Sequence, residues 1–441
     1  MANVQVPYDT AEKMGVFLNL DIADQNLVAS FVPEEPSALP NLAEAVAYAV
    51  EHPLGCKPLS EQIRKGDKVV IITENQFRAA PASEILPELF GRIQSAGGEV
   101  RCIAIGTGKV PPLSNEEIEE KLGKEIVATG ISVVCNDVSR PENYVYRGIT
   151  SRGVPVFVLK EVAEADVVIS IATTQATLWG YGGSGMIIPA VCGNETIEMN
   201  HMFSLPADCR PGNNDCHMQA DKYEAARMVG IDMGIQMIVN NSFEVSYIQA
   251  GDYVDSHKAT VKAYDQVYRF DATQFAGAPA DIVITGTSAP TNHLYFHTSW
   301  AAVNVDPIVK DGGTIIHASP CPGYGDWPGF ALMDLMSSYL PPSSDHIPQA
   351  LRAFYAKDRE LWAGCIWWKI YEVMTRKDIV VVTQTDNLQA ARDVGLGASD
   401  SIQRAFGAAM EKHGPNARVA FVPYGRYTVL DVWQNVLCLA S

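Results

Sequence analysis

Charged side chains follow two apolar runs of the sequence at the points where each run ends. Glu74 and Arg78 come after Lys68-Val-Val-Ile-Ile-Thr73, and Lys109 closes a Gly-Thr-Gly-Lys turn after Arg101-Cys-Ile-Ala-Ile-Gly106. A guanidinium can hold a carboxylate through two parallel hydrogen bonds. A lysine can accept a proton when its pKa falls towards neutrality. These residues therefore indicate a site that binds an anion and moves a proton, with a solvated surface lysine as the alternative for Lys109.

A third segment is rich in glycine. Five glycines lie within residues 180–193, soon after the apolar run Asp166-Val-Val-Ile-Ser-Ile-Ala172. Glycine lets backbone N–H groups approach a phosphate, which makes Gly182, Gly183, Ser184 and Gly185 candidate phosphate-binding residues. The spacing matches neither the dinucleotide fingerprint nor the P-loop. An ordinary structural turn is the alternative interpretation.

The three apolar runs alternate with helical patterns, which is typical of a parallel α/β sheet. A helix is expected from Ser83, and another after Ser114, where a glutamate three residues later completes a capping-box pattern. Ligands in such sheets bind beyond the carboxyl ends of the strands. The charged and glycine-rich segments lie at those ends, so we expect an α/β fold with its site there.

A second α/β region begins after the small-residue stretch 275–280, with strands expected at 281–286, 313–317 and 378–383. Before it, the pattern predicts a helix at 222–228, two β-like runs at 233–240 and 243–250, and a helix from Tyr253. We predict two α/β lobes with a substrate and cofactor cleft between them. The N-terminal domain is expected to span residues 1–275 and to be joined by the returning segment 417–441. The C-terminal domain is expected at residues 281–416.

The composition limits the classes of function. The chain has 441 residues, 47% of them apolar and 19% charged, which suits two ordinary hydrophobic cores. A net charge of −18 argues against nucleic-acid binding. No apolar run is long enough for a membrane span, and the N-terminus lacks the pattern of a secretion signal. Nine scattered cysteines are typical of reduced thiols, so we expect a cytoplasmic protein without a disulfide framework.

Several motifs occur in a defined order. They are Ile-Thr-Glu-Asn-Gln-Phe-Arg-Ala-Ala-Pro (72–81), Ile-Gly-Thr-Gly-Lys-Val-Pro-Pro (105–112), Tyr-Arg-Gly-Ile-Thr-Ser-Arg-Gly-Val-Pro-Val (146–156), the glycine-rich segment, and Asn-Glu-Thr-Ile-Glu-Met-Asn-His (194–201). In this order and spacing the chain resembles the nickel-dependent lactate racemase family over about residues 15–425.

The resemblance implies a particular chemistry. The family uses a nickel–pincer nucleotide, a pyridinium that holds nickel through sulfur and carbon atoms and is tethered to a lysine through a thioamide, while a histidine completes the nickel coordination. The cofactor takes a hydride from the 2-carbon of a hydroxy acid as a basic side chain takes the hydroxyl proton. The keto intermediate is then reduced from its other face, so two bases, usually histidines, are needed.

This chain has some of the family's functional residues and replaces others. The nickel-ligating histidine falls on His201 and the substrate-carboxylate arginine on Arg78. The tethering lysine falls on Gly185, which cannot form a thioamide, and the two catalytic histidines fall on Lys109 and Gln175. A hydrogen-bonded core histidine is the alternative for His201.

A pincer nucleotide, if used, is therefore expected to be held without a covalent bond. Its phosphate is expected on the segment from Gly182 to Gly185, with Glu74 as a further cofactor-binding residue and the metal at His201.

In the second lobe, a Tyr-Gln-Ser-Val-Lys pattern of the family becomes Phe296-His297-Thr298-Ser299-Trp300. The resemblance thus places His297 and Trp300 where the family has substrate-contacting residues, and Trp367 where it has a substrate-packing tryptophan. We predict that Lys109 and His297 form an acid–base pair, that Arg78 and Gln175 contact a small or aromatic carboxylate, and that the tryptophans wall the pocket.

These positions predict an isomerase of the racemase or epimerase type. A non-redox lyase, hydrolase or hydratase without the nickel nucleotide, and a protein that binds the cofactor or a carboxylate, are the alternatives. The stretch Cys209-Arg-Pro-Gly-Asn-Asn-Asp-Cys216-His217 lacks the spacing of a standard metal site and is expected to be a loop with incidental cysteines.

Overall fold

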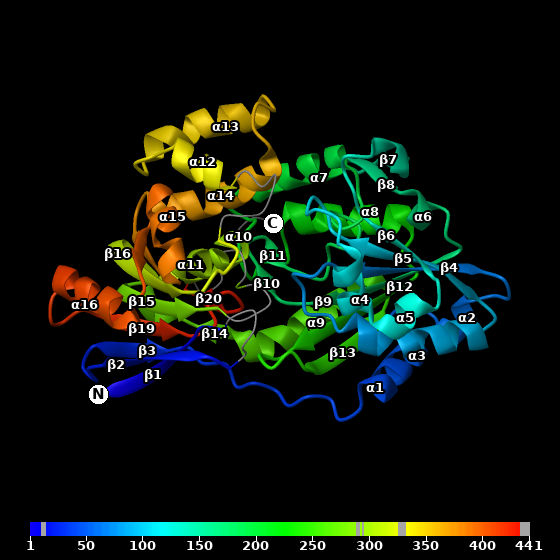
Figure 1. Ribbon diagram of the computed structural model, residues 1–441, viewed down its shortest axis with the longest axis horizontal. Helices are drawn as coiled ribbons and strands as arrows, with labels where there is room; N and C mark the ends of the chain where they lie inside the picture. The colour runs from blue at the N-terminus through cyan, green and yellow to red at the C-terminus, as the bar shows by residue number, and fades with distance from the viewer. Residues whose placement is uncertain (10–14, 288–291, 293–294, 325–331, 433–441) are drawn as a thin grey trace. The chain divides into compact units, whose positions relative to one another are not determined.

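The computed structural model describes residues 1–9, 15–287, 292, 295–324 and 332–432 (Figure 1). The chain has the mixed α/β architecture expected from the sequence and divides into two compact units. The first unit comprises Glu35–Gln175 and Trp179–Val267, and the second comprises Met1–Glu34, Ala176–Leu178 and Tyr268–Ser441. No helix within the described ranges is both long and apolar enough to cross a membrane.

The sheet of the first unit is built around three adjacent buried strands. Strand β4 (Lys68–Glu74) lies between β9 (Val167–Thr173) and β5 (Glu99–Gly106). Strands β12 (Met233–Val239) and β6 (Ser132–Cys135) extend the sheet on either side, and all five are parallel. Every residue of β9 is buried, which explains its continuous apolar run.

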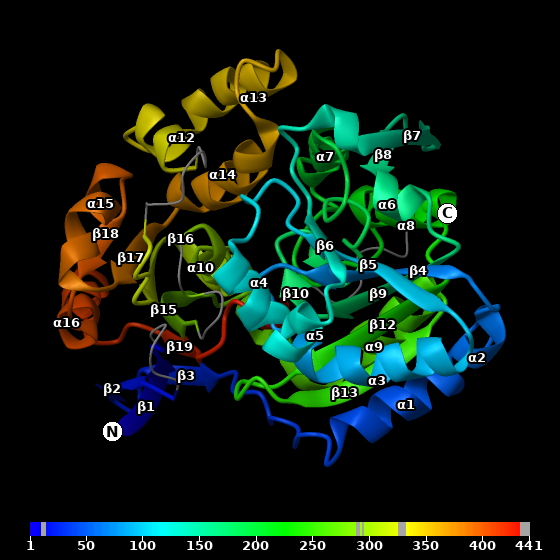
Figure 2. The same ribbon diagram turned by 45° about the vertical axis from the view of Figure 1, so that its right-hand side comes forward.

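Helices cover both faces of this sheet. A single apolar cluster joins the sheet to α1 (Leu42–Glu51) and α3 (Ala82–Ser95), which run along the same face (Figure 2). On the opposite face α9 (Tyr253–Tyr268) approaches β12 so closely that a Cβ on Gly234 would lie 3.0 Å from Ser256 Oγ. The other elements of the unit are α2 (Leu59–Gln62), α4 (Asn115–Leu122), α5 (Lys124–Ala128), α6 (Lys160–Ala163), α7 (Asn194–His201), α8 (His217–Val229), the hairpin of β7 (Tyr144–Ile149) and β8 (Pro155–Leu159), and the edge strand β13 (Val245–Gly251).

The second unit contains a fully parallel sheet in the order β18-β17-β16-β15-β19-β3. Its strands are β3 (Leu27–Ser30), β15 (Ala280–Gly286), β16 (Val309–Ala318), β17 (Asp378–Val382), β18 (Gly397–Ser399) and β19 (Val419–Val422). The hairpin of β1 (Ala2–Pro7) and β2 (Phe17–Ile22) packs with α16 (Ile402–His413) in one apolar cluster with the sheet. The remaining elements are α10 (Tyr295–Thr298), α11 (Trp300–Val305), α12 (Leu332–Ser338), α13 (Ile347–Tyr355), α14 (Leu361–Met374), α15 (Leu388–Asp393), β14 (Arg269–Asp271) and β20 (Val429–Asp431).

The units to which the chain termini belong differ from the prediction. The sequence predicts one domain of residues 1–275 joined by 417–441 and a second domain of residues 281–416, whereas the described ends of the chain both lie in the second unit. Strand β3 joins the edge of the second sheet, where the backbone N–H of Phe31 donates to the carbonyl of Phe421 over 2.8 Å. Strands β19 and β20 also pair within the second unit, and residues 433–441 lie outside the described part. The backbone pairing that assigns a terminal strand to one sheet or the other leaves no local pattern in the sequence.

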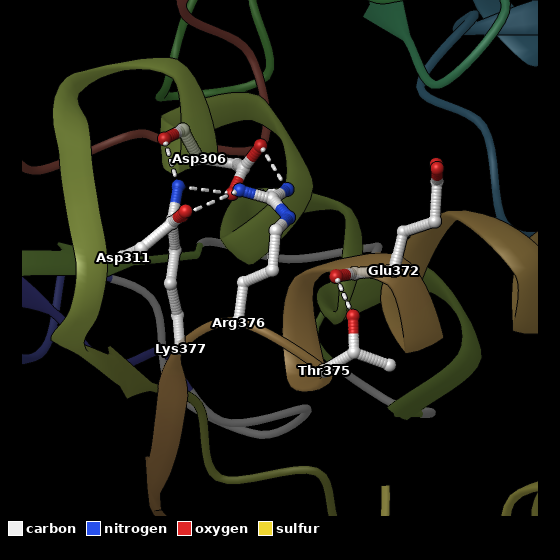
Figure 3. A network of polar contacts seen from close by, with 6 residues as sticks. All are labelled: Asp306, Asp311, Glu372, Thr375, Arg376 and Lys377. Carbon is white, nitrogen blue, oxygen red and sulfur yellow. Dashed lines mark hydrogen bonds and ion pairs between the residues drawn. The ribbon is translucent and has the colours of Figure 1, made fainter. Parts of the chain in front are cut away.

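An ion cluster holds the amino ends of two strands of the second sheet (Figure 3). Asp306, just before β16, accepts a hydrogen bond from Arg376 Nη2 at 3.0 Å. Lys377, just before β17, donates to the Asp306 carbonyl over 2.7 Å and also to the Asp306 carboxylate. Lys377 is buried, whereas Asp311, which receives Arg376 Nη1 at 3.1 Å, is largely exposed. Asp306 therefore neutralises a buried ammonium at the end of the sheet opposite to the strand carboxyl ends.

Candidate active-site residues

Glu74 ends β4 and ties it to the neighbouring strand. Its buried carboxylate accepts hydrogen bonds from the backbone N–H and the hydroxyl of Thr173, both at 2.9 Å, and from the N–H of Ala80 at 3.4 Å. Burial raises the pKa of this carboxyl, while Lys121 and Arg78 act in the opposite direction. The group predicted to bind a cofactor thus joins the ends of β4 and β9.

The segment that carries Arg78 is fixed by a lysine of α4. Lys121 Nζ donates to the carbonyls of Arg78 and Ala80, both at 3.0 Å, and burial lowers the pKa of Lys121 to about 8. Arg78 is half-buried, and its Nη1 donates to the carbonyl of Phe77 over 3.0 Å. Lys121 could not be identified from the sequence, because nothing in a helical pattern distinguishes it from a solvated lysine.

The turn that carries Lys109 packs on the glycine-rich segment. The N–H of Gly108 donates to the carbonyl of Ala190 over 3.1 Å, and the buried amide of Asn136 donates to the carbonyls of Gly108 and Cys192. This packing holds the Lys109 backbone at the end of β5.

Lys109 forms an ion pair with a residue that the sequence analysis missed. Its Nζ lies 2.8 Å from Glu198 Oε1, and the Lys109 side chain is only 7% exposed. Glu198 lies on α7, one helical turn before His201. The i, i+3 spacing of these two residues in the motif at 194–201 is the sequence signal that could have identified Glu198.

His201 is a buried, neutral imidazole. Its Nδ1 lies 2.7 Å from the carbonyl of Ile197, and because a carbonyl can only accept, Nδ1 carries the hydrogen and Nε2 the lone pair. Burial and the cations Lys222 and Lys109 lower the pKa of His201 to about 3. The indole of Trp179 packs edge-to-face against the ring at 5.6 Å between centroids.

This arrangement fits a metal ligand. Histidine ligands commonly donate one ring N–H to a carbonyl and use the other nitrogen for the metal. Within the described ranges, no three His, Cys, Asp or Glu side chains converge on one point. A metal at His201 would therefore need further donors from a bound cofactor.

Two buried glutamines hold the glycine-rich segment. Gln236 Nε2 donates to the carbonyl of Gly183 over 3.0 Å. Gln219 Nε2 donates to the carbonyl of Tyr181 over 2.8 Å, and Gln219 Oε1 accepts from the hydroxyl of Ser184. A Cβ on Gly183 would lie 2.4 Å from Gln236 Oε1, and its φ of +93° is a glycine conformation. The structural-turn interpretation thus accounts for this glycine.

His257 secures the same segment from α9. Its Nε2 lies 2.7 Å from the carbonyl of Gly182, so Nε2 donates and Nδ1 accepts from the hydroxyl of Tyr223, also at 2.7 Å. Burial lowers the pKa of His257 to about 4, so the ring is neutral. Gln175, half-buried at the start of the segment, accepts from the N–H of Gly182 through its backbone carbonyl at 2.8 Å.

The segment presents consecutive backbone donors. No acceptor among the described residues takes the N–H groups of Gly183, Ser184 or Gly185. Three such donors suit a phosphate. The backbone of Gly185 is not in the left-handed region, and a Cβ at this position would lie 3.3 Å from Pro189 Cδ. Glycine has no side-chain amine, so Gly185 cannot form a covalent tether.

In the second unit, His297 and Trp300 lie together. Their rings are 5.9 Å apart in an edge-to-face arrangement, and the guanidinium of the buried Arg426 lies 3.9 Å above the Trp300 ring. Asn304 Nδ2 fixes the Arg426 loop by donating to the carbonyls of Gly425 and Arg426 at 2.9 and 3.1 Å. Arg426 is not among the residues predicted from the sequence, although it follows the end of β19 much as Arg78 follows β4.

Trp367 lies inside an aromatic cluster of the second unit. It is fully buried on α14, stacks on Tyr371 at 4.4 Å between centroids, and contacts Tyr339 and Phe354. Its predicted part in a substrate wall has no support from these contacts, which are those of a core residue.

In the first unit, Glu198 therefore links Lys109 to the helix that carries His201, and the turn before Lys109 packs on the glycine-rich segment. The second unit brings together His297 and Trp300. Residues that the sequence analysis did not identify complete these arrangements: Lys121, Glu198, Gln219, Lys222, Gln236, His257 and Arg426.

The first unit carries a neutral histidine and a glycine-rich segment with consecutive backbone donors, and its sequence matches a known domain model. Residues 15–210 match the model described as the lactate racemase N-terminal domain. The chain is 24% identical to a lactate racemase of Thermoanaerobacterium thermosaccharolyticum, over 96% of this chain and 98% of that one. It is also 24% identical to a lactate racemase of Lactiplantibacillus plantarum, over 96% and 99%.

Solved structures share the fold. The lactate racemase apoprotein from T. thermosaccharolyticum aligns with a TM-score of 0.84 at 21% identity, over 98% of this chain and 100% of that chain. A protein from Thermotoga maritima aligns with a TM-score of 0.68 at 16% identity, over 91% and 100%. The resemblance predicted from the sequence motifs is thereby confirmed.

Proposed function

We propose that this chain is an isomerase of the racemase or epimerase type that acts on a small or aromatic 2-hydroxy carboxylate. The observation that carries the proposal is the cluster of Lys109, Glu198 and His201, where a proton-carrying pair lies beside a neutral histidine. The curated relatives, which match this chain over nearly their full length and are named lactate racemase, support the reaction type.

A nickel–pincer nucleotide suits most of this site. His201 Nε2 would complete the metal coordination, and the N–H groups of Gly183, Ser184 and Gly185 would hold the phosphate. When bound, this group supplies a reversible hydride acceptor for the 2-carbon of the substrate. Gly185 offers no amine, so the nucleotide would be held by non-covalent contacts alone.

Lys109 and Glu198 would move the hydroxyl proton of the substrate. A lysine ammonium must give up a proton before it can accept one, and Glu198 Oε1, at 2.8 Å, is placed to take it. The pair would then hold one proton between two groups and exchange it with the substrate oxygen. Gln175 cannot titrate and would contribute a hydrogen bond only.

Arg78 would bind the substrate carboxylate, for which a guanidinium is well suited. In the second unit we assign the other proton acceptor to His297 and an apolar contact for a larger substituent to Trp300. Trp367 would act only by shaping the aromatic cluster in which it lies.

A non-redox lyase, hydrolase or hydratase acting through Lys109 and His297 is the second candidate. The observation in its favour is Gly185, because the covalent tether of the family has no attachment point there. A protein that binds the cofactor or a carboxylate without turning it over is the third.

Metal analysis combined with mass spectrometry separates the three. The full chain would be purified from a host that makes the nickel nucleotide, then examined under native and denaturing conditions. We expect one nickel per chain, a nucleotide mass that is lost on denaturation, and interconversion of the enantiomers of lactate or phenyllactate on a chiral column. Nickel and nucleotide without turnover would indicate a binding protein. Turnover of a carboxylate in metal-free protein would indicate the non-redox enzyme.

A further inference from the structure

The loop between β4 and α3, residues 75–81, carries Arg78 and begins with a turn around Asn75. The side-chain oxygen of Asn75 accepts a hydrogen bond from the backbone N–H of Phe77 over 3.1 Å, and the Asn75 carbonyl accepts from the N–H of Arg78 over 3.2 Å. Asparagine commonly stabilises turns in this way. These two bonds shape residues 75–78, but they do not attach the turn to the rest of the unit.

The far end of the loop is attached on both sides of Ala80. The backbone N–H of Ala80 donates to Glu74 Oε2 over 3.4 Å, and its carbonyl accepts from Lys121 Nζ at 3.0 Å. Glu74 is itself bonded to Thr173 of β9, whereas Lys121 belongs to α4. The bond from Lys121 is the shorter of the two and therefore the stronger. Ala80 is thus tied to the sheet on one side and to α4 on the other.

Lys121 also contacts the residue to which the proposed function assigns the substrate carboxylate. Its Nζ donates to the carbonyl of Arg78 over 3.0 Å, so one ammonium bridges residues 78 and 80. The guanidinium of Arg78 turns back onto the same loop, where Nη1 donates to the carbonyl of Phe77 over 3.0 Å. The orientation of the guanidinium therefore depends on the backbone that Lys121 holds.

Helix α4 is itself fixed at both ends. Ser114 and Glu117 form the capping box at its start, with bonds of 2.8 and 3.2 Å. At its end, a Cβ on Gly123 would lie 3.1 Å from Ser83 Cβ of α3, and the Gly123 φ of +88° is a glycine conformation. Lys121 lies in the last turn, where a positive charge also suits the helix dipole. The helix thus presents the ammonium at a defined place beside the loop.

We propose that Lys121 is a positioning residue for the binding of the substrate carboxylate. By holding the carbonyls of Arg78 and Ala80, it keeps the guanidinium oriented for a contact through two parallel hydrogen bonds. Without this attachment, the loop would have to be ordered each time a carboxylate binds, which weakens the affinity. The inference rests on the role of Arg78 in the proposed function, and it assigns Lys121 no contact with the substrate.

The test measures how well a carboxylate protects Arg78 from phenylglyoxal, a reagent that modifies guanidinium groups. The full chain, purified as for the metal analysis, would be treated with phenylglyoxal at increasing concentrations of phenyllactate. Peptide mass spectrometry would follow the modification of Arg78, with the other arginines as internal references. The phenyllactate concentration that halves the rate at Arg78 measures the affinity of this residue for a carboxylate without requiring turnover.

Three variants of Lys121 and one control define the expected result. Lys121→Met keeps an unbranched side chain without the donor and should need about tenfold more phenyllactate for protection, because each carbonyl loses a hydrogen bond from a charged group. Lys121→Arg can still donate to two carbonyls and should stay within about threefold of the unmodified chain. Lys121→Gln, which keeps N–H donors without the charge, should lie between the two and serves if the methionine variant does not fold. Lys124→Met, at an exposed position in α5, should change nothing.

Two further measurements separate positioning from a general structural role. Hydrogen exchange in residues 75–81 should be faster in Lys121→Met than in the unmodified chain. In the loaded enzyme the same variant should raise KM while kcat stays within about twofold, because the proton-transfer groups are untouched. Faster exchange with unchanged protection of Arg78 would overturn the inference and leave the proposed function standing. No protection of Arg78 even in the unmodified chain would overturn the carboxylate role of Arg78, and the inference with it.

Discussion

Lys109 Nζ and Glu198 Oε1 lie 2.8 Å apart, and Glu198 is placed on the helix that carries His201. The sequence predicts Lys109 as a base that acts with His297, whereas in the structure a carboxylate is its immediate partner. Glu198 is consequently the carboxylate within hydrogen-bond distance of Lys109. This pairing makes Glu198 the residue to test first.

Replacing Glu198 by glutamine keeps a hydrogen-bond acceptor for Lys109 but removes the group that can take its proton. We expect Glu198→Gln to lower kcat by about 10²-fold, the usual contribution of a positioned acid or base. Nickel content should not change, because Glu198 is not assigned to the metal. Glu195→Gln, on the exposed side of the same helix, is the control and should keep normal turnover.

The predicted acid–base pair can be tested with two single variants. Lys109→Ala and His297→Ala are each expected to lower turnover by about 10² or more with the fold retained, because each removes a proton-transfer group. Circular dichroism and chiral chromatography give the two measurements. Near-normal turnover in both variants would place the proton transfer on other residues.

The missing tether gives a gain-of-function test. Gly185 is outside the left-handed region, and its virtual Cβ contacts only Pro189 Cδ at 3.3 Å and the Ile188 carbonyl at 3.4 Å, so a side chain fits after a small shift. We expect Gly185→Lys, produced in a host that makes the nickel nucleotide, to carry a cofactor adduct that survives denaturation. Gly185→Ala tests the added Cβ alone and should show none. A lysine variant without an adduct would argue against a nucleotide on this segment.

The local elements of the fold could be predicted from the sequence because their signals are local. The apolar runs at 68–73 and 166–172 are the strands β4 and β9, and Ser114 forms the expected capping box with Glu117. The helix expected from Ser83 begins instead at Ala82, with no side-chain cap. A capping residue is therefore informative when both partners of the box are present.

The site could be predicted only where a residue follows a strand end. Lys109 and Arg78 are predicted in this way, and His201 through the family resemblance. Gln219, Gln236 and His257 act through contacts with residues at least 35 positions away in sequence, and in a helical or strand pattern they look like ordinary polar positions. Long-range polar contacts of this kind leave no periodic signal.

The ion cluster at the amino ends of β16 and β17 provides a stability test (Figure 3). Asp306→Asn would leave the buried ammonium of Lys377 without a carboxylate, and breaking a buried pair costs about 3–5 kcal/mol. Asp311→Asn removes an exposed partner of Arg376 and should change the free energy of unfolding by less than about 1 kcal/mol. Urea denaturation of the two variants measures the difference, and equal losses would refute the assigned role of Asp306.

His317 makes acid stability a second measurable property. It is fully buried in β16 between Thr285 and Val381 of the adjacent strands, and neither ring nitrogen has a hydrogen-bond partner in the described part of the chain. Burial lowers its pKa to about 3, against an ordinary value of 6.5. Between these values the unfolded chain binds a proton that the folded chain does not, so folding stability is lost as the pH falls below about 6.5.

His317→Leu should remove this linkage. No hydrogen bond is lost and the volume is similar, so we expect stability at pH 7.5 to stay equal or to rise. Between pH 6 and 4, the free energy of unfolding of the variant should fall less steeply than that of the unmodified chain, by up to about 1.4 kcal/mol per pH unit. Urea denaturation at several pH values gives both slopes. His201 and His257 are buried and neutral in both proteins, so they contribute equally to the pH dependence of the free energy of unfolding. Identical slopes for the two proteins would mean that His317 binds its proton without unfolding the chain.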